Sequence, residues 1–208
     1  MTDEVDLESI RTEVRRLADK YGCEYWRDLE PDRYPEEFVA DLTAHGWLGA
    51  LIPEEYGGGG LSLTGASVIL EEIAASGGNP RACHAQMYVM GTLLRHGSDE
   101  QKRRYLPEIA DGRLRLQAFG VAEPIAGSDT GSIRTRAERD GDTWRINGQK
   151  IWTSRALYSD LMVVLARTTP PDECEAHTDG LSVFLIHLRD PDGELVPGLS
   201  INPIPTMM

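Results

Sequence analysis

Two stretches of the sequence combine residue types that can hold a ligand. The first runs from Phe119 to Thr130 (FGVAEPIAGSDT) and the second from Gly148 to Ser154 (GQKIWTS). The first ends a β-prone run in a loop of Gly, Ser, Asp and Pro, which can turn backbone N–H groups and a hydroxyl toward an anion. The second places the flat indole of Trp152 beside two hydroxyls. Together they suit a ligand that is partly phosphate and partly planar ring.

Gly127 and Ser128 are the clearest candidates for ligand contact in the first stretch. A glycine lets a ligand approach the backbone, and a serine hydroxyl with its amide can hold a phosphate or carbonyl oxygen. In the second stretch, Trp152 is either a core side chain or a platform for a ring. It would face the same way as Ser154 if this segment is extended.

Glu123 is a carboxylate inside the first stretch, which makes it a candidate general base. Nothing near it in the sequence is placed to raise its pKa, and a Glu before Pro is a common way to enter a turn. We therefore give Glu123 no catalytic role.

Two other features have ordinary structural explanations. The glycines 57–60 fit neither GxGxxG nor GxxxxGK, and we interpret them as a mobile or close-packed turn. Tyr88 with Met87 and Met90 could line an acyl pocket, but apolar residues at helical spacing more often belong to a core.

The composition argues against several classes of protein. The 208-residue chain has a net charge of −13, whereas nucleic-acid binding needs concentrated positive charge. Its three cysteines are far apart and its five histidines form no HExxH pair, so we expect neither a disulfide framework nor a metal site. The N-terminus is acidic, and no apolar run is long enough to span a bilayer. We expect a soluble, cytoplasmic protein without nucleic-acid or membrane partners.

The first half of the chain has the apolar spacing of helices. Leu7, Ile10 and Val14, for example, repeat at helical intervals with charged residues between them. Asn79 is a candidate cap, and Ser98 has capping-box spacing to Gln101. We predict five helices, which begin near Leu7, Pro35, Ser62, Pro80 and Ser98.

Beyond residue 113 the apolar residues change from helical spacing to the alternation that is typical of β-strands. Residues 133–138 alternate between apolar and charged, and 140–142 form a predicted turn into a return strand with Trp144 and Ile146. The other predicted elements are a tight turn at 147–148 and two buried strands, 161–166 and 181–186.

Helices followed by strands, without βαβ alternation, predict an α+β fold with two segregated domains. We expect an N-terminal all-helical domain over residues 1–113 and an antiparallel β-barrel or sandwich domain over residues 114–208. A further strand-like run begins at Val196, and the chain stops soon afterwards at Met208. We therefore expect the β domain to be incomplete at its C-terminus and the sequence to have been cut.

Taken together, these residues resemble the acyl-CoA dehydrogenase family. The two stretches named first carry the resemblance, with support from residues 53–58 (PEEYGG), 96–102 (HGSDEQK) and 105–107 (YLP). The likeness covers nearly all of the chain in order. It implies the family's fold, which has an N-terminal helical domain, a middle β domain and a C-terminal helical bundle, with FAD between the last two.

The resemblance also implies which residues contact the ligands. Three groups are implied: Phe119, Val121 and Ala122 along the flavin; Gly127 and Ser128 at the cofactor or the acyl-CoA; and Trp152, Thr153 and Ser154 as a second flavin contact. Ser154 would donate its hydroxyl toward the reactive nitrogen N5. Ala122 stands where the family usually has Thr, so one hydrogen bond to the flavin ring is missing or is made by water instead. If nothing replaces it, the loss is on the order of 1 kcal/mol.

The implied reaction is the α,β-desaturation of an acyl-CoA thioester, as in fatty acid metabolism. A hydride leaves the substrate β-carbon for N5 while a Glu removes the α-proton, and the electrons pass to an electron-transfer flavoprotein. The family's Glu lies in the C-terminal bundle, so we assign no catalytic residue in this chain. The full-length form is implied to be a homo-oligomer, a dimer or a tetramer.

Two alternatives stay open at the level of the sequence. One is a relative that uses the same flavin scaffold with oxygen, as an oxidase or monooxygenase. The other is a non-catalytic truncated paralogue that binds flavin or acyl-CoA, or pairs with a full-length partner. The absent bundle favours this binding module, whereas the intact flavin loop favours the enzyme.

Overall fold

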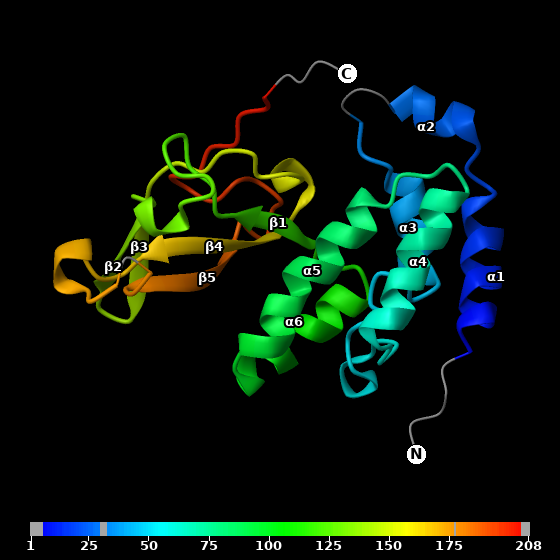
Figure 1. Ribbon diagram of the computed structural model, residues 1–208, viewed down its shortest axis with the longest axis horizontal. Coiled ribbons are helices and arrows are strands. Elements are labelled where there is room, and N and C mark those ends of the chain that lie inside the picture. Colours follow the sequence, from blue (N-terminus) through cyan, green and yellow to red (C-terminus); the bar gives the residue numbers. More distant parts are fainter. Residues whose placement is uncertain (1–5, 30–32, 177, 205–208) are drawn as a thin grey trace. The chain divides into compact units, whose positions relative to one another are not determined.

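A computed structural model describes residues 6–29, 33–176 and 178–204 (Figure 1). The chain divides into two compact units, the first ending at Leu116 and the second beginning at Gln117. Helices make up the first unit and a sheet the second, so the predicted α+β class is confirmed. The acidic run before Asp6, His177 and the residues after Ile204 lie outside the described residues.

The first unit holds six α-helices within its described residues, and the short 3-10 helix η1 (Glu54–Tyr56). They are α1 (Leu7–Ala18), α2 (Cys23–Leu29), α3 (Glu36–Ala44), α4 (Leu63–Ala75), α5 (Arg81–His96) and α6 (Asp99–Ala110). None of the helices in the described chain is both long and apolar enough to cross a membrane.

The prediction of five helices missed α2. This helix has seven residues and buries none of them fully, so it lacks the apolar stripe that marks a helix in a sequence. Its aromatic side chains are held by edge-on contacts instead, with the Trp26 and Phe38 ring centroids 4.9 Å apart. The predicted cap at Ser98 is confirmed as a complete capping box with Gln101, whereas Pro80 rather than Asn79 is the N-cap of α5.

A buried carboxylate links α1 to α4, which run alongside each other in Figure 1. Glu72 is only 2% exposed. It accepts hydrogen bonds from Arg11 at 2.7 Å and from Arg15 at 2.6 Å. The hydrogen bond from Arg11, followed by that from Arg15, lowers the pKa of Glu72. A charge this deeply buried is tolerated because both oxygens are paired.

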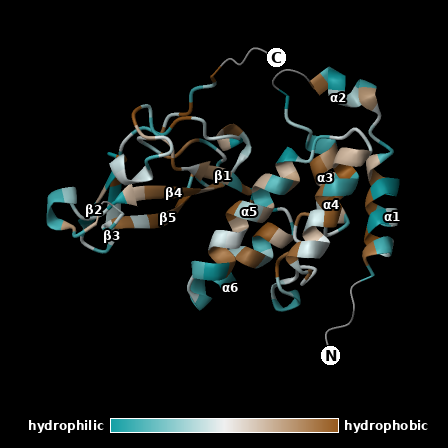
Figure 2. Cartoon of the chain, in the orientation of Figure 1, coloured by the Kyte–Doolittle hydropathy of each residue, from teal (hydrophilic) through white to brown (hydrophobic). Residues whose placement is uncertain are grey.

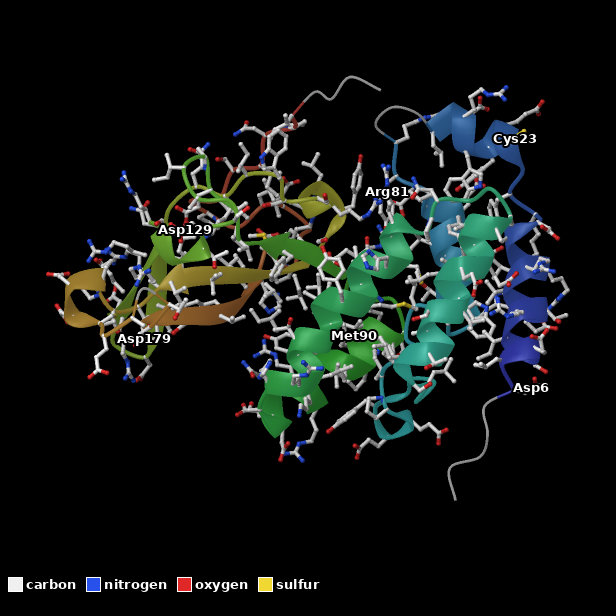
Figure 3. All side chains as sticks on the ribbon, in the orientation of Figure 1. Asp6, Cys23, Arg81, Met90, Asp129 and Asp179 are labelled. Atoms are coloured by element: carbon white, nitrogen blue, oxygen red, sulfur yellow. The ribbon has the colours of Figure 1, made fainter. Side chains whose placement is uncertain are left out.

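The methionines of α5 belong to the core of the helical unit. Met87 is 4% exposed and Met90 is fully buried, and Figure 3 shows Met90 on α5. Tyr88, by contrast, is 45% exposed. The glycine run 57–60 is a close-packed turn, because a Cβ on Gly58 would lie 2.2 Å from the carbonyl oxygen of Ile52.

The second unit is built on one five-stranded sheet. Its strands are β1 (Leu116–Gly120), β2 (Arg136–Asp140), β3 (Thr143–Asn147), β4 (Leu161–Arg167) and β5 (Leu181–His187). In the described part of this unit, three 3-10 helices lie between the strands: η2 (Thr130–Ser132), η3 (Ala156–Tyr158) and η4 (Pro171–Glu173).

The sheet is mixed. β2 and β3 form the predicted antiparallel hairpin, with Arg136 opposite Asn147 and Gly141 at the turn with a φ of 61°. β4 pairs antiparallel with β5 along its whole length. β2 also meets β4 in parallel at Arg136 and Arg167, so the sheet is not purely antiparallel. The central strand β4 is nearly all buried, and Figure 2 shows its hydrophobic colouring.

The strand β2 begins later than the alternation in the sequence predicts. Burial does alternate from Ile133 to Ala137, but residues 133–135 are not part of the strand. The physical reason is that the backbone N–H groups of Arg134 and Thr135 donate to the Glu123 carboxylate. A side chain therefore takes the place of a neighbouring strand there.

Three further predictions for the sheet unit were wrong in part. The chain makes no turn at 147–148, because Gly148 instead packs directly against Thr135. Residues 181–186 do form a strand, but it is only half buried, and Val183 is 56% exposed. A local run of apolar residues does not report whether a second layer covers a strand. Residues 196–201 form no strand in the described chain.

Replacing Glu72→Gln should destabilise the helical unit by about 1–3 kcal/mol, because the amide nitrogen that replaces one carboxylate oxygen is a donor and cannot accept from the arginine it faces, and because the negative charge is lost. Urea unfolding followed by far-ultraviolet circular dichroism measures the change. The control is Glu71→Gln, whose carboxylate also contacts Arg11 but is 62% exposed. Its effect should stay below about 0.5 kcal/mol. Equal effects of the two variants would contradict the importance given to burial.

Replacing Gly148→Ala should loosen the sheet unit. The new Cβ would lie 2.3 Å from Thr135 Oγ1 and 2.6 Å from Thr135 Cα, so backbone must shift. We expect amide hydrogen exchange in β4 to become at least about tenfold faster. Gly127→Ala is the control, since no atom lies within 4 Å of its Cβ position. Similar exchange rates in the two variants would show that the close approach at Gly148 is unimportant.

Candidate functional site

The two stretches singled out in the sequence lie against each other in the sheet unit. The backbone N–H of Ile151 donates to the carbonyl of Ala122 at 2.9 Å. One residue earlier, Lys150 Nζ donates to the carbonyl of Val121 at 3.0 Å. The structure therefore brings the first stretch, which begins at the end of β1, into direct contact with the second, just after β3.

The first stretch folds into a tight turn and then an open loop. Glu123 and Ala126 exchange two backbone hydrogen bonds, of 2.8 and 3.1 Å, across the turn. Gly127 and Ser128 follow and are exposed. The space around Gly127 is open, because no atom lies within 4 Å of its Cβ position. Asp129, labelled in Figure 3, marks this loop and accepts a hydrogen bond from the Ser132 hydroxyl.

The second stretch carries an exposed and strained tryptophan. Trp152 is 65% exposed and has a φ of 60°, and Arg155 has a φ of 62°. Non-glycine residues adopt this left-handed conformation rarely, at a cost of about 1–3 kcal/mol. The segment is therefore not extended, so the condition under which Trp152 and Ser154 would face the same way is not met. Ser154 itself is exposed.

Thr153 supplies a polar atom that lacks a partner. Its Oγ1 is buried and has no hydrogen-bond partner among the described residues. Buried hydroxyls in folded proteins are nearly always hydrogen-bonded, so such an atom calls for an explanation. A bound molecule with a polar edge would provide one.

Phe119, Val121 and Ala122 line the start of the first stretch. Phe119 is 39% exposed, although its neighbour Ala118 on β1 is fully buried. Val121 and Ala122 are half-buried. All eight residues predicted to contact the flavin or substrate thus lie on the two stretches that the hydrogen bonds join. All eight keep some exposure to solvent, and Thr153 also has the unsatisfied hydroxyl.

The Glu123 carboxylate accepts hydrogen bonds from three donors. Its side chain is 4% exposed. Its oxygens accept from the N–H of Arg134 at 2.7 Å, the N–H of Thr135 at 2.9 Å and Lys150 Nζ at 2.8 Å. Burial raises the pKa of this carboxyl group, but the contacts with Lys150, Thr135 and Arg134 outweigh burial, and the pKa falls to about 2. A carboxylate with this pKa is a weak base, which agrees with giving it no catalytic role.

The ion pair of Glu123 and Lys150 makes the sheet unit sensitive to acid. Because the pKa of Glu123 in the folded chain lies below its ordinary 4.5, its charge stabilises the fold above that pH. This stabilisation is lost as the pH falls from about 4.5 toward 2. Burial lowers the pKa of Lys150, and the attraction of Glu123 opposes that shift without cancelling it. The desolvation of both groups therefore offsets part of the gain from pairing.

Sequence reasoning missed Lys150. Its side chain is 9% exposed, and its ammonium joins Val121 and Glu123 of the other stretch. A lysine is almost never buried without a partner, but the sequence does not say which lysine is buried. The only local signal was its position inside the second stretch. The close packing of Gly148 on Thr135 was equally hidden, because it joins residues far apart in the chain.

An open cavity of about 630 Å³ also lies in the sheet unit. Its lining includes four arginines and one indole, which are Arg134, Arg136, Arg139, Arg167 and Trp144. Such a lining could hold an anionic group. None of the eight predicted contact residues lines it, so we keep this cavity apart from the site formed by the two stretches.

The residues present fit a planar, partly anionic cofactor such as FAD. The exposed rings of Phe119 and Trp152 offer apolar surface, and the unpartnered Thr153 hydroxyl offers a polar contact. The open backbone at Gly127 and the Ser128 hydroxyl can receive an anionic or carbonyl oxygen. Glu123 offers no base near neutrality, because its pKa is lowered to about 2.

Two family models match the chain. The acyl-CoA dehydrogenase N-terminal domain matches residues 4–113, and the acyl-CoA dehydrogenase middle domain matches residues 118–208. Acyl-CoA dehydrogenase FadE12 of Mycobacterium tuberculosis is 36% identical over 211 residues, which cover 98% of this chain and 52% of that protein. The chain thus spans about half the length of the curated relatives it matches.

Solved structures give the same result. The ChsE4–ChsE5 complex from Mycobacterium tuberculosis matches with a TM-score of 0.76 at 35% identity, over 90% of this chain and 48% of that one. An acyl-CoA dehydrogenase from Geobacillus kaustophilus matches with a TM-score of 0.81 at 27% identity, over 92% of this chain and 50% of that one. With both domain models matched in order and the same fold in these structures, the chain belongs to the acyl-CoA dehydrogenase family.

Proposed function

We propose that this chain supplies the flavin-contacting part of an FAD-dependent acyl-CoA dehydrogenase. The reaction is the α,β-desaturation of an acyl-CoA thioester, with an electron-transfer flavoprotein as electron acceptor. The observation that carries the proposal is the hydrogen-bonded contact between the two stretches, of which the Ile151–Ala122 bond of 2.9 Å is the backbone part. This contact supports the proposal because it joins the two stretches on which the eight candidate residues lie.

Each group of residues has its own task in this proposal. Phe119, Val121 and Ala122 line one edge of the flavin, and Trp152, Thr153 and Ser154 line another. Gly127 and Ser128 receive oxygen atoms of the cofactor or the acyl-CoA. FAD, when bound, supplies the acceptor for the hydride that leaves the substrate. The chain's own contribution is to orient the ligands and to exclude water from between them.

The proton that leaves the substrate is not assigned to a residue of this chain. Glu123 directly follows the proposed contact Ala122 in sequence, but three donors already occupy its oxygens. We further propose domains over residues 1–113 and 114–208, and a homo-oligomeric form of the full-length protein. These rest on the family and on the change from helices to strands.

The central prediction is that the purified chain binds FAD and that an acyl-CoA reduces it slowly, with a buffer base taking the α-proton because no residue of this chain is assigned to it. The bound flavin should give a yellow protein whose visible absorbance bleaches when a saturated acyl-CoA is added without oxygen. An enoyl-CoA serves as control, because it has already lost the hydrogens at its α- and β-carbons. A flavin-loaded chain that never bleaches would favour the binding-module alternative, and a chain that takes up no FAD would overturn the proposal. Rapid reoxidation by air alone would favour an oxidase.

Replacing Ala122→Thr should tighten FAD binding about fivefold, the equivalent of roughly 1 kcal/mol, because the new hydroxyl can bond to the ring. Ala122 is half-buried, so its side chain is still partly open to solvent. Titration of FAD with the apo chain, followed by flavin fluorescence, measures the affinity. The control is Ala176→Thr on an exposed loop of the same unit. Unchanged affinity in both variants would remove Ala122 from the flavin site.

A further inference from the structure

Three consecutive residues of the first stretch each give one acceptor to the second. The Val121 carbonyl accepts from Lys150 Nζ at 3.0 Å, and the Glu123 carboxylate accepts from the same ammonium at 2.8 Å. Between them, the Ala122 carbonyl accepts from the Ile151 N–H at 2.9 Å. The donors are likewise neighbours in the chain. This set of bonds fixes both the distance and the register between the two stretches.

A third segment closes the arrangement into a ring of contacts. The backbone N–H groups of Arg134 and Thr135 donate to the same Glu123 carboxylate, at 2.7 and 2.9 Å. Thr135 in turn packs on Gly148 so closely that any Cβ there would lie within 2.7 Å of its atoms. Residues 121–123, 134–135 and 148–151 therefore hold one another. We call these three segments with the Glu123–Lys150 pair the clamp.

The clamp ends where the proposed flavin contacts begin. Trp152 follows Ile151 directly in the chain and has a φ of 60°. A left-handed tryptophan persists only where its surroundings fix the backbone, and the clamp is what precedes it. Val121 and Ala122 belong to the clamp through their carbonyls, while their side chains are half-buried. The residues that make the buried hydrogen bonds of the clamp are thus the same as those proposed to contact the flavin, or adjacent to them.

We propose that Glu123 and Lys150 are positioning residues, whose buried pairing sets the spacing between residues 121–122 and 152–154 that a flavin needs. The inference rests on the proposed function. It assigns a task to the one carboxylate of the first stretch that is fully buried, and that task is not proton transfer. A fixed spacing matters because a small misplacement of oriented groups weakens both binding and reaction.

The test separates positioning from stability with a matched pair of double variants. Lys150→Met alone leaves the buried carboxylate uncompensated, so the sheet unit should unfold more easily. Combining it with Glu123→Gln removes both charges, so much of the lost stability should return. The control is Asp140→Asn with Arg145→Met, which neutralises an exposed pair of the same unit whose side chains are 62% and 74% exposed.

Three quantities are measured on the full 208-residue chain: the unfolding midpoint, the affinity and visible spectrum of bound FAD, and the hydrogen exchange of the Ile151 amide. In the Glu123→Gln/Lys150→Met variant we expect FAD to bind at least about tenfold more weakly, with a less structured visible spectrum. We expect the Ile151 amide to exchange at least about tenfold faster. The Asp140→Asn/Arg145→Met control should match the wild type in all three.

The outcomes are distinct. If the wild type binds FAD and the Glu123→Gln/Lys150→Met variant binds it equally well with the same spectrum, the positioning role is wrong and the proposed function stands. If that variant loses affinity only in proportion to its loss of folded protein, the pair is structural and the inference fails. A wild type that binds no FAD overturns the proposed function. The inference is then decided by the Ile151 amide, and unchanged protection in the variant overturns it as well.

Discussion

The sheet unit depends on one buried interaction, the carboxylate of Glu123 with its three donors. An ionised carboxylate with 4% of its side chain exposed is costly unless its oxygens are paired. Here two backbone N–H groups and the Lys150 ammonium pair them, so charge and burial coexist. Because the donors come from two other segments, satisfying this carboxylate brings together parts of the chain that lie far apart in sequence.

The same interaction explains why the site has its form. Groups that hold the segments together face inward, while the groups left for a ligand are exposed or lack a partner. Trp152 is 65% exposed and strained, and the Thr153 hydroxyl is buried without a partner among the described residues. Strain and unsatisfied polar atoms are retained in proteins mostly where function needs them. A flavin at this edge would make use of both features.

Much of this arrangement could be predicted from sequence, because it follows from local periodicity. The apolar spacing that buries Ile10 and Val14 marks α1, and alternation marks the β2–β3 hairpin. The short α2 has no such stripe and was missed. Burial of residues 181–186 was predicted wrongly, because it depends on whether another layer of the fold covers the strand rather than on the strand itself.

The candidate site, too, could be predicted from the sequence only in part. Both ligand-type stretches were visible as residue types, and the structure brings them together. Neither the buried position of Lys150 nor the left-handed Trp152 was predictable, since the first depends on a partner far along the chain and the second on a rare backbone conformation. Long-range pairing and strain are fixed by the whole fold, so a reading of local patterns cannot report them.

The most direct test of this account is an NMR titration of the Glu123 carboxyl carbon in the folded chain, assigned by comparison with the Glu123→Gln variant. We expect the resonance to stay that of a carboxylate as the pH is lowered through 4.5, with a midpoint at about 2. A midpoint near the ordinary 4.5 while the chain is still folded would contradict it, because the carboxylate would then not be held by its three donors.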